Sequence, residues 1–133
     1  MAVFSDERVS TMSTTLDRLV GTHRATQNAH FVAVFEADDE VLTIEVANGA
    51  GQVRTGRHGE PDFGLSGPAA DWELYFSKRP VSHSSLIAMM VTEDVSSGVY
   101  PSSLAPVGDI ERLFANLPIY NTVIESATTG GRR

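Results

Sequence analysis

The stretch that decides the fold is residues 62–90, DFGLSGPAADWELYFSKRPVSHSSLIAMM. It contains the only tryptophan of the chain, Trp72. Ser-Gly-Pro at 66–68 and Lys-Arg-Pro at 78–80 interrupt it, because Gly and Pro end regular elements. The pattern predicts a strand, a helix, a turn and a second helix. We expect the two helices to cover a sheet and to close over either an apolar core or an apolar cavity.

Both helices of this stretch have one apolar face. Pro68 suits a first helical position because its missing N–H would have no partner there. The first helix places Ala69, Trp72, Tyr75 and Phe76 on one side. The second, capped by Ser82 or Ser84, carries Leu86, Met89 and Met90 on its buried side. Aromatic rings and deformable Met side chains together provide a large, adaptable apolar surface.

The chain before this stretch predicts one helix followed by strands. Residues 5–20 have a helical apolar stripe, a serine at the start and acidic residues in the first turn. Alternating apolar residues predict strands at 31–37 and 41–46, a polar strand at 52–55 and a short strand at 62–66. Asn48-Gly49 predicts a tight turn, since both residues tolerate positive φ. We expect these strands to form an antiparallel meander.

The chain after this stretch predicts one more strand, at 95–100, and a final helix capped by Asp109. The residues expected to face inward are Ile110, Leu113, Phe114, Leu117, Ile119, Val123 and Ile124, with a kink or restart at Pro118. The expected fold class is α+β, an antiparallel meander sheet of about five strands covered on one face by helices. We expect one domain over residues 1–127 and a disordered tail over 128–133.

Composition excludes several classes of function. A net charge of −7 with a single lysine, Lys78, disfavours nucleic acid and anionic membranes, which basic clusters bind. The absence of cysteine excludes disulfides and zinc–thiolate sites. The four histidines lack metal-ligand spacing, so we expect no metal and no cofactor. Without a signal peptide or an apolar run of about 20 residues, a cytoplasmic protein without stable membrane insertion is expected.

One set of motifs resembles a known family. It comprises Asp62-Phe63-Gly64-Leu65-Ser66-Gly67-Pro68, then Trp72, Phe76 and Pro80, and finally Ser85-Leu86 and Met89-Met90. Together they resemble the sterol carrier protein 2 (SCP2) module that occurs alone or fused to microbial α/β-hydrolases, over roughly residues 31–117. The resemblance implies a hydrophobic tunnel between sheet and helices that holds a fatty acyl, sterol or similar molecule. The family usually has a strand directly before a Gly-Asp pair, whereas here an extended stretch, 92–107, precedes Gly108-Asp109.

The residues expected to contact such a ligand come from the sheet and both helices. Phe35 and Ile44 would form the floor if their strand faces point inward. The complete set is Phe35, Ile44, Trp72, Tyr75, Phe76, Leu86, Met89 and Met90. The alternative is that these side chains fill one another's space as a solid core, as protein interiors ordinarily do.

One trio of residues is a candidate for acid–base chemistry. Asp71 and Tyr75 lie four residues apart on the first helix, and His83 follows in the turn, where its near-neutral pKa suits a general base. Their alternative interpretation is solvent-exposed surface. Three functions therefore stay open: binding of an apolar molecule, a cofactor-independent isomerase, cyclase or hydratase, and an accessory domain that forms a homodimer.

Overall fold

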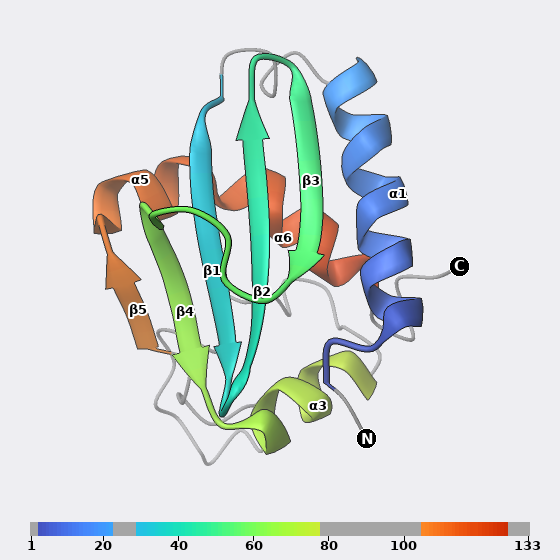
Figure 1. The fold of residues 1–133 in the computed structure, drawn as a ribbon, viewed down its shortest axis with the longest axis vertical. Helices are drawn as coiled ribbons and strands as arrows, with labels where there is room; N and C mark the ends of the chain where they lie inside the picture. The colour runs from blue at the N-terminus through green and yellow to red at the C-terminus, as the bar shows by residue number, and fades with distance from the viewer. Residues whose placement is uncertain (1–2, 23–28, 78–104, 128–133) are drawn as a thin grey trace.

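The structure, a computed structural model, describes residues 3–22, 29–77 and 105–127. Its elements follow one another along the chain as Figure 1 shows. They are α1 (Asp6–Thr22), β1 (Phe31–Ala37), β2 (Glu40–Ala47), β3 (Ala50–Thr55), β4 (Phe63–Gly67), α3 (Ala69–Ser77), β5 (Ala105–Gly108), α5 (Ile110–Ala115) and α6 (Leu117–Glu125). The α+β class is confirmed. The predicted helix at 82–90, the predicted strand at 95–100 and the tail at 128–133 lie outside the described residues.

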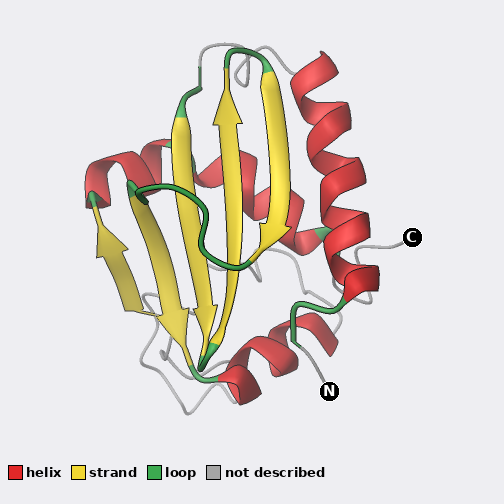
Figure 2. Ribbon diagram, viewed as in Figure 1, coloured by secondary structure: helices red, strands yellow, loops and turns green. Residues whose placement is uncertain are grey.

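The sheet is mixed, so the predicted antiparallel meander is wrong in one respect. The strand order is β3-β2-β1-β4-β5, and β4 runs parallel to β1. The reason is the segment between β3 and β4, which crosses the face of the sheet instead of turning back beside β3 (Figure 2). Hydrogen bonds hold this crossing: the Gly56 N–H donates to the Val41 carbonyl at 2.7 Å, and the Asp62 N–H donates to the Val32 carbonyl at 2.7 Å.

The two hairpins agree with the sequence prediction. Strand β1 has the predicted bounds, and Asp38 in the following turn has a φ of 56°. Asn48 and Gly49 between β2 and β3 have φ values of 54° and 75°, the positive pair that a tight two-residue hairpin requires. Local turn chemistry therefore fixes the register of β1, β2 and β3.

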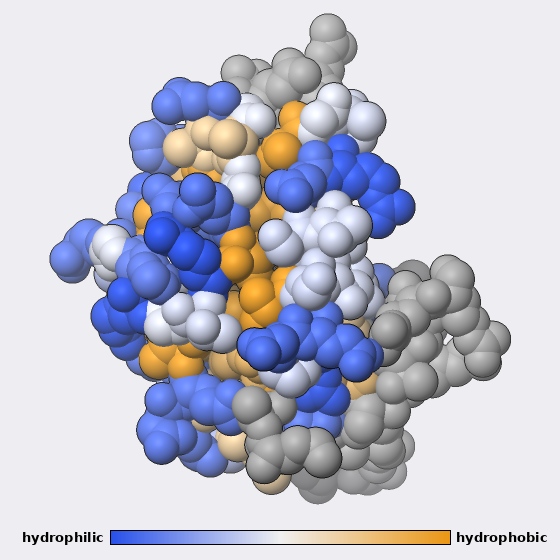
Figure 3. Space-filling model, turned by 45° about the vertical axis from the view of Figure 1, so that its right-hand side comes forward, coloured by the Kyte–Doolittle hydropathy of each residue, from blue (hydrophilic) through white to orange (hydrophobic). Residues whose placement is uncertain are grey.

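The helices cover the face of the sheet opposite to the crossing segment. Helix α6 runs behind the strands, α1 lies along β3, and α3 lies at the end where β1 and β4 finish (Figures 1 and 2). A Cβ at Gly51 of β3 would lie 2.7 Å from Leu16, so the close approach of α1 depends on this glycine. With the α1 side turned forward, Figure 3 shows a narrow apolar strip between hydrophilic flanks.

Two glycines of the SCP2-like motifs allow the backbones of β1, β4 and β5 to meet. A Cβ at Gly64 would lie 2.0 Å from the Val34 carbonyl oxygen of β1. Gly108 has a φ of +84°, and a Cβ there would lie 2.6 Å from the Asp62 carbonyl oxygen. The strand expected beside the Gly108-Asp109 pair is present as β5, which ends on Gly108 itself.

The final helical region is two helices, with fewer inward residues than predicted. Asp109 caps α5, and its carboxylate accepts from the Arg112 N–H at 3.2 Å. The chain restarts at Pro118, as expected, to form α6. Ile110 and Phe114, predicted to be inward, are each 42% exposed. A helix of six residues directs one short stripe toward the sheet, and in α5 Leu113 is the buried residue.

Candidate functional site

Seven aromatic rings form a continuous chain between the sheet and its helical cover. This aromatic cluster consists of Phe4, Phe31, Phe35, Phe63, Trp72, Phe76 and Tyr120. Neighbouring ring centroids lie 5.3 to 6.3 Å apart, within the range of favourable aromatic pairs. The cluster extends from the rings of α3 to the rings carried by β1, β4 and α6.

Trp72 is the centre of the cluster at the α3 end. Its side chain has no exposed surface, and its indole N–H donates to the Glu36 carbonyl oxygen of β1 at 2.9 Å. The ring meets Phe4 and Phe35 edge-on, at centroid distances of 5.6 and 6.2 Å. The one polar atom of the indole is thus satisfied, and the remainder contributes apolar contact.

Helix α3 is fixed to the rest of the fold by polar contacts at its start and at its middle. At its start, the Ala69 N–H donates to the Asp38 carboxylate at 3.1 Å, and the Asp38 N–H donates to the Gly67 carbonyl at 3.1 Å. Further along, the Arg8 guanidinium of α1 donates to both carboxylate oxygens of Glu73, at 2.7 and 2.9 Å. This bidentate hydrogen bond lowers the pKa of Glu73 below its usual value.

Tyr120 of α6 is a buried phenol that the sequence analysis did not select. Its ring contacts Phe35 and Phe63, and its hydroxyl donates to the Leu113 carbonyl at 3.0 Å. Burial raises its pKa well above the ordinary value for tyrosine, so the hydroxyl stays protonated at neutral pH. The signal was available, because Tyr120 precedes the inward residues Val123 and Ile124 by three and four positions.

The structure brings four predicted ligand-contacting residues to the helix-covered side of the sheet. Phe35, Ile44, Trp72 and Phe76 have no exposed surface. Of the remaining four, Tyr75 lies on α3, where its side chain is not described, and Leu86, Met89 and Met90 lie outside the described residues. Their role in binding stays a prediction.

The catalytic trio also stays a prediction. Asp71 and Tyr75 share helix α3, but neither side chain is described, and His83 lies outside the described part of the chain. Among the described residues, the ionisable side chains that reach the aromatic cluster include the Tyr120 phenol, which stays protonated at neutral pH, and the Arg8 guanidinium, 4.7 Å from the centre of the Phe76 ring.

The arginines near the sheet are paired with carboxylates. Arg54 lies 3.3 Å from Glu45, and Arg112 lies 2.9 Å from Asp62. Arg57, on the crossing segment, pairs with Glu36 of β1. Over residues 3–22, 29–77 and 105–127, no three acidic or histidine side chains gather as metal ligands, and no helix has the length and apolarity to cross a bilayer.

Comparison with known proteins shows likeness at the level of the fold. No protein-family model and no curated protein matches the sequence. A solved structure named UbiJ-SCP2, a ubiquinone synthesis protein, superposes on 86% of this chain and 94% of its own, with 13% identity and a TM-score of 0.52. The chain has an SCP2-like fold.

A second SCP2-like structure covers nearly the whole chain. It is a conserved hypothetical protein from Thermus thermophilus, described as a possible sterol carrier protein. It superposes on 98% of this chain and 92% of its own, with 16% identity and a TM-score of 0.56. The resemblance drawn from the motifs around Trp72 is therefore confirmed for the fold.

Proposed function

We propose that this SCP2-like protein binds an apolar small molecule, such as a fatty acyl, sterol, terpenoid or polyketide-like compound, between the sheet and its helical cover. The observation that carries the proposal is the aromatic cluster beneath α3. It lies in a fold shared with a protein described as a possible sterol carrier. The ligand would contact Phe35, Trp72 and Phe76, with Leu86, Met89 and Met90 as a further wall.

Binding requires that α3 or its side chains move, because Trp72 and Phe76 are fully buried in the unliganded chain. The polar contacts opposing that movement are modest. The indole–carbonyl hydrogen bond contributes about 1 kcal/mol, and the half-exposed Arg8–Glu73 pair contributes less than about 1 kcal/mol. A ligand that buries ~300 Å² of apolar surface gains about 7 kcal/mol before association costs. A ligand with a large apolar body is therefore needed to replace the apolar contacts that Trp72 and Phe76 lose when α3 moves.

Trp72 provides the test, because it is the only tryptophan in the chain. Titration with a fatty acid or a sterol should change its emission saturably, and the same compounds should displace a fluorescent fatty acid. Native mass spectrometry of the purified protein should detect a co-purifying apolar molecule. Absence of both displacement and a co-purifying molecule would contradict the proposal.

Two matched variants locate the binding site. Phe76→Leu changes a fully buried ring beside Trp72, and Phe114→Leu changes a ring on α5 that is 42% exposed. We expect Phe76→Leu to alter affinity in the displacement assay and Phe114→Leu to leave it unchanged. Equal effects of the two variants would place the ligand elsewhere.

A further inference from the structure

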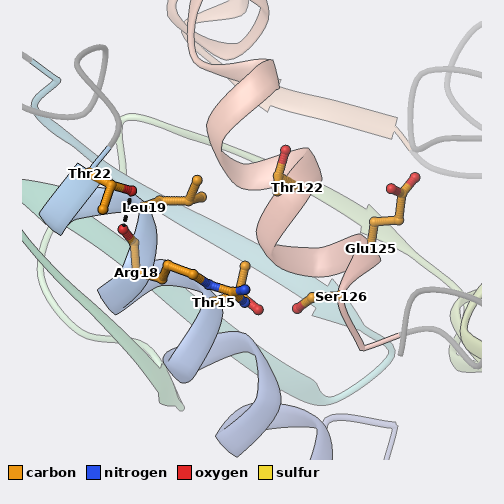
Figure 4. A pocket seen from close by; sticks show the side chains of 7 residues that line it. All are labelled: Thr15, Arg18, Leu19, Thr22, Thr122, Glu125 and Ser126. Carbon is orange, nitrogen blue, oxygen red and sulfur yellow. Dashed lines mark hydrogen bonds between the residues drawn. The ribbon is translucent and has the colours of Figure 1, made fainter. Parts of the chain in front are cut away.

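A groove separates α1 from α6, away from the aromatic cluster. Its volume is about 370 Å³, near the lower end of the range for small-molecule sites. Six of its seven lining residues have polar side chains: four hydroxyls, one arginine and one glutamate, beside one leucine. These residues are Thr15, Arg18, Leu19, Thr22, Thr122, Glu125 and Ser126 (Figure 4).

Thr15 is a buried hydroxyl without a hydrogen-bond partner among the described residues. Its exposed fraction is 7%, and it points into the groove toward α6 (Figure 4). Thr43 provides the contrast: it is 1% exposed, donates to the Gly56 carbonyl at 2.6 Å and accepts from the His58 N–H at 3.3 Å. Buried hydroxyls are ordinarily paired, because leaving one unpaired destabilises the fold. The orphaned Thr15 hydroxyl therefore points to a partner that comes from outside the chain.

Arg18 is the second group of the groove that lacks a partner in the described part of the chain. Its side chain runs along α1 toward Thr15, one turn earlier on the same helix (Figure 4). Within residues 3–22, 29–77 and 105–127 its guanidinium forms no ion pair, whereas Arg8, Arg54, Arg57 and Arg112 all do. A guanidinium offers five N–H donors suited to an oxyanion.

The other hydroxyls present acceptors to the groove. Thr22 donates to the Arg18 carbonyl at 2.7 Å, Thr122 to the Pro118 carbonyl at 2.8 Å, and Ser126 to the Val123 carbonyl at 2.5 Å. Since each hydroxyl has one hydrogen and two lone pairs, the oxygens remain able to accept. The groove thus combines strong donors at Arg18 and Thr15 with a row of neutral acceptors on both helices.

We propose that the groove between α1 and α6 binds a small hydroxylated oxyanion, a sugar acid or a sugar phosphate. The oxyanion accepts hydrogen bonds from Arg18 and Thr15, and the hydroxyls of the ligand donate to the oxygens of Thr122 and Ser126. The Glu125 carboxylate on the α6 side of the groove repels anions, so the oxyanion is expected on the α1 side, beside Arg18 and Thr15. This groove shares no lining residue with the apolar site proposed above.

Four probes test the ligand class in calorimetric or NMR titrations of the full chain. Gluconate and glucose 6-phosphate carry both an oxyanion and hydroxyls, glucose lacks the oxyanion, and acetate lacks the hydroxyls. We expect saturable binding of at least one of the first two, and binding at least about tenfold weaker for glucose and acetate. Tighter binding of gluconate would identify the anion as a carboxylate, and tighter binding of glucose 6-phosphate would identify it as a phosphate. Absence of saturable binding by both would overturn the proposal.

Thr15→Val separates a ligand-binding hydroxyl from a structural one. Removing an unpaired buried hydroxyl should raise Tm, while affinity for the bound probe falls at least about tenfold. Thr11→Val is the control, since that hydroxyl lies on the same helix and donates to the Glu7 carbonyl outside the groove. A lower Tm for Thr15→Val, or unchanged affinity, would overturn the proposal.

Arg18→Gln tests the charge. It should weaken binding of the charged probe at least about tenfold and leave the weak binding of glucose unaltered. Arg54→Gln is the matched control, because Arg54 is an exposed arginine on β3 that does not line the groove. Equal losses for the two variants would indicate a nonspecific charge effect and would count against the site.

Discussion

The α3 end and the α1–α6 seam cover the same face of the sheet in opposite ways. At the α3 end, aromatic rings interlock, the indole N–H reaches the Glu36 carbonyl, and Glu73 is paired with Arg8. At the seam, a groove of about 370 Å³ remains, with a buried threonine hydroxyl and an arginine unpaired among the described residues. The polar side chains described at the α3 end have partners, whereas Thr15 and Arg18 at the seam have none among the described residues.

The difference separates what holds the fold from what is available for a ligand. Satisfied polar groups and packed rings stabilise the α3 end, so a ligand there has to replace protein contacts. The seam already offers unmet hydrogen bonds, so a ligand there adds contacts without breaking any. The variants below test this contrast, from the largest expected effect to the smallest.

Among these variants, Gly64→Ala should lower the stability of the protein most, by displacing the α3 end. A Cβ at this position would lie 2.0 Å from the Val34 carbonyl oxygen, so β4 and the α3 helix that follows it cannot keep their place. We expect a loss of more than about 4 kcal/mol in the free energy of unfolding, measured by denaturant titration. Gly21→Ala is the control, because nothing lies within 4 Å of its Cβ position. It should be neutral or stabilising by up to about 1 kcal/mol.

Trp72→Ala should destabilise the protein by about 3–5 kcal/mol, because it empties the centre of the aromatic cluster and removes the hydrogen bond to Glu36. Phe114→Ala, on the exposed side of α5, should cost less than about 1 kcal/mol. Urea unfolding followed by far-UV circular dichroism measures both. A loss under about 1 kcal/mol for Trp72→Ala would mean that the indole is not part of the core.

Thr43→Val should destabilise by about 1–3 kcal/mol, since it leaves the Gly56 carbonyl and the His58 N–H without their partner. The same change at Thr15 should stabilise, as described above. The two buried threonines thus predict opposite signs in one thermal unfolding assay. The same sign for both would remove the contrast between the paired and the unpaired hydroxyl.

Glu73→Gln should have the smallest effect, well under about 1 kcal/mol at neutral pH, because the pair with Arg8 is partly solvent-exposed. Since folding lowers the pKa of Glu73 below its ordinary 4.5, its contribution is present above pH 4.5 and is lost as the pH falls through the folded value. The stability difference between the wild-type protein and the variant should therefore shrink on acidification. A constant difference from pH 7 to 3 would exclude the ion pair as its source.

Local features of the fold were predictable from sequence, and strand order was not. The alternation of apolar residues predicted the bounds of β1, and Asn48-Gly49 predicted the second hairpin. Pro68 and the apolar face around Trp72 predicted α3. Each depends on neighbours along the chain. The parallel pairing of β4 with β1 depends on where the crossing segment makes its hydrogen bonds with Val41, Thr43 and Val32, which no local pattern encodes.

The candidate sites divide in the same way. Periodicity placed Trp72 and Phe76 on the buried side of α3, but it overextended the inward stripe to Ile110 and Phe114, because the break at Asn116 reorients the chain between α5 and α6. The groove lined by Thr15 and Arg18 was not expected from the sequence. A threonine without a hydrogen-bond partner is a property of the folded packing, and helical periodicity alone does not reveal it.

Arg8 has a consequence for motion. Its guanidinium contacts the Val3 carbonyl, both oxygens of Glu73 and the ring of Phe76, so one side chain of α1 holds three partners around α3. A displacement of α3 away from the strands therefore has two outcomes: it breaks the bidentate pair, or it pulls the first turn of α1 with it. In the second outcome, α1 moves together with α3. The positions of Thr15 and Arg18 relative to α6 then change as well.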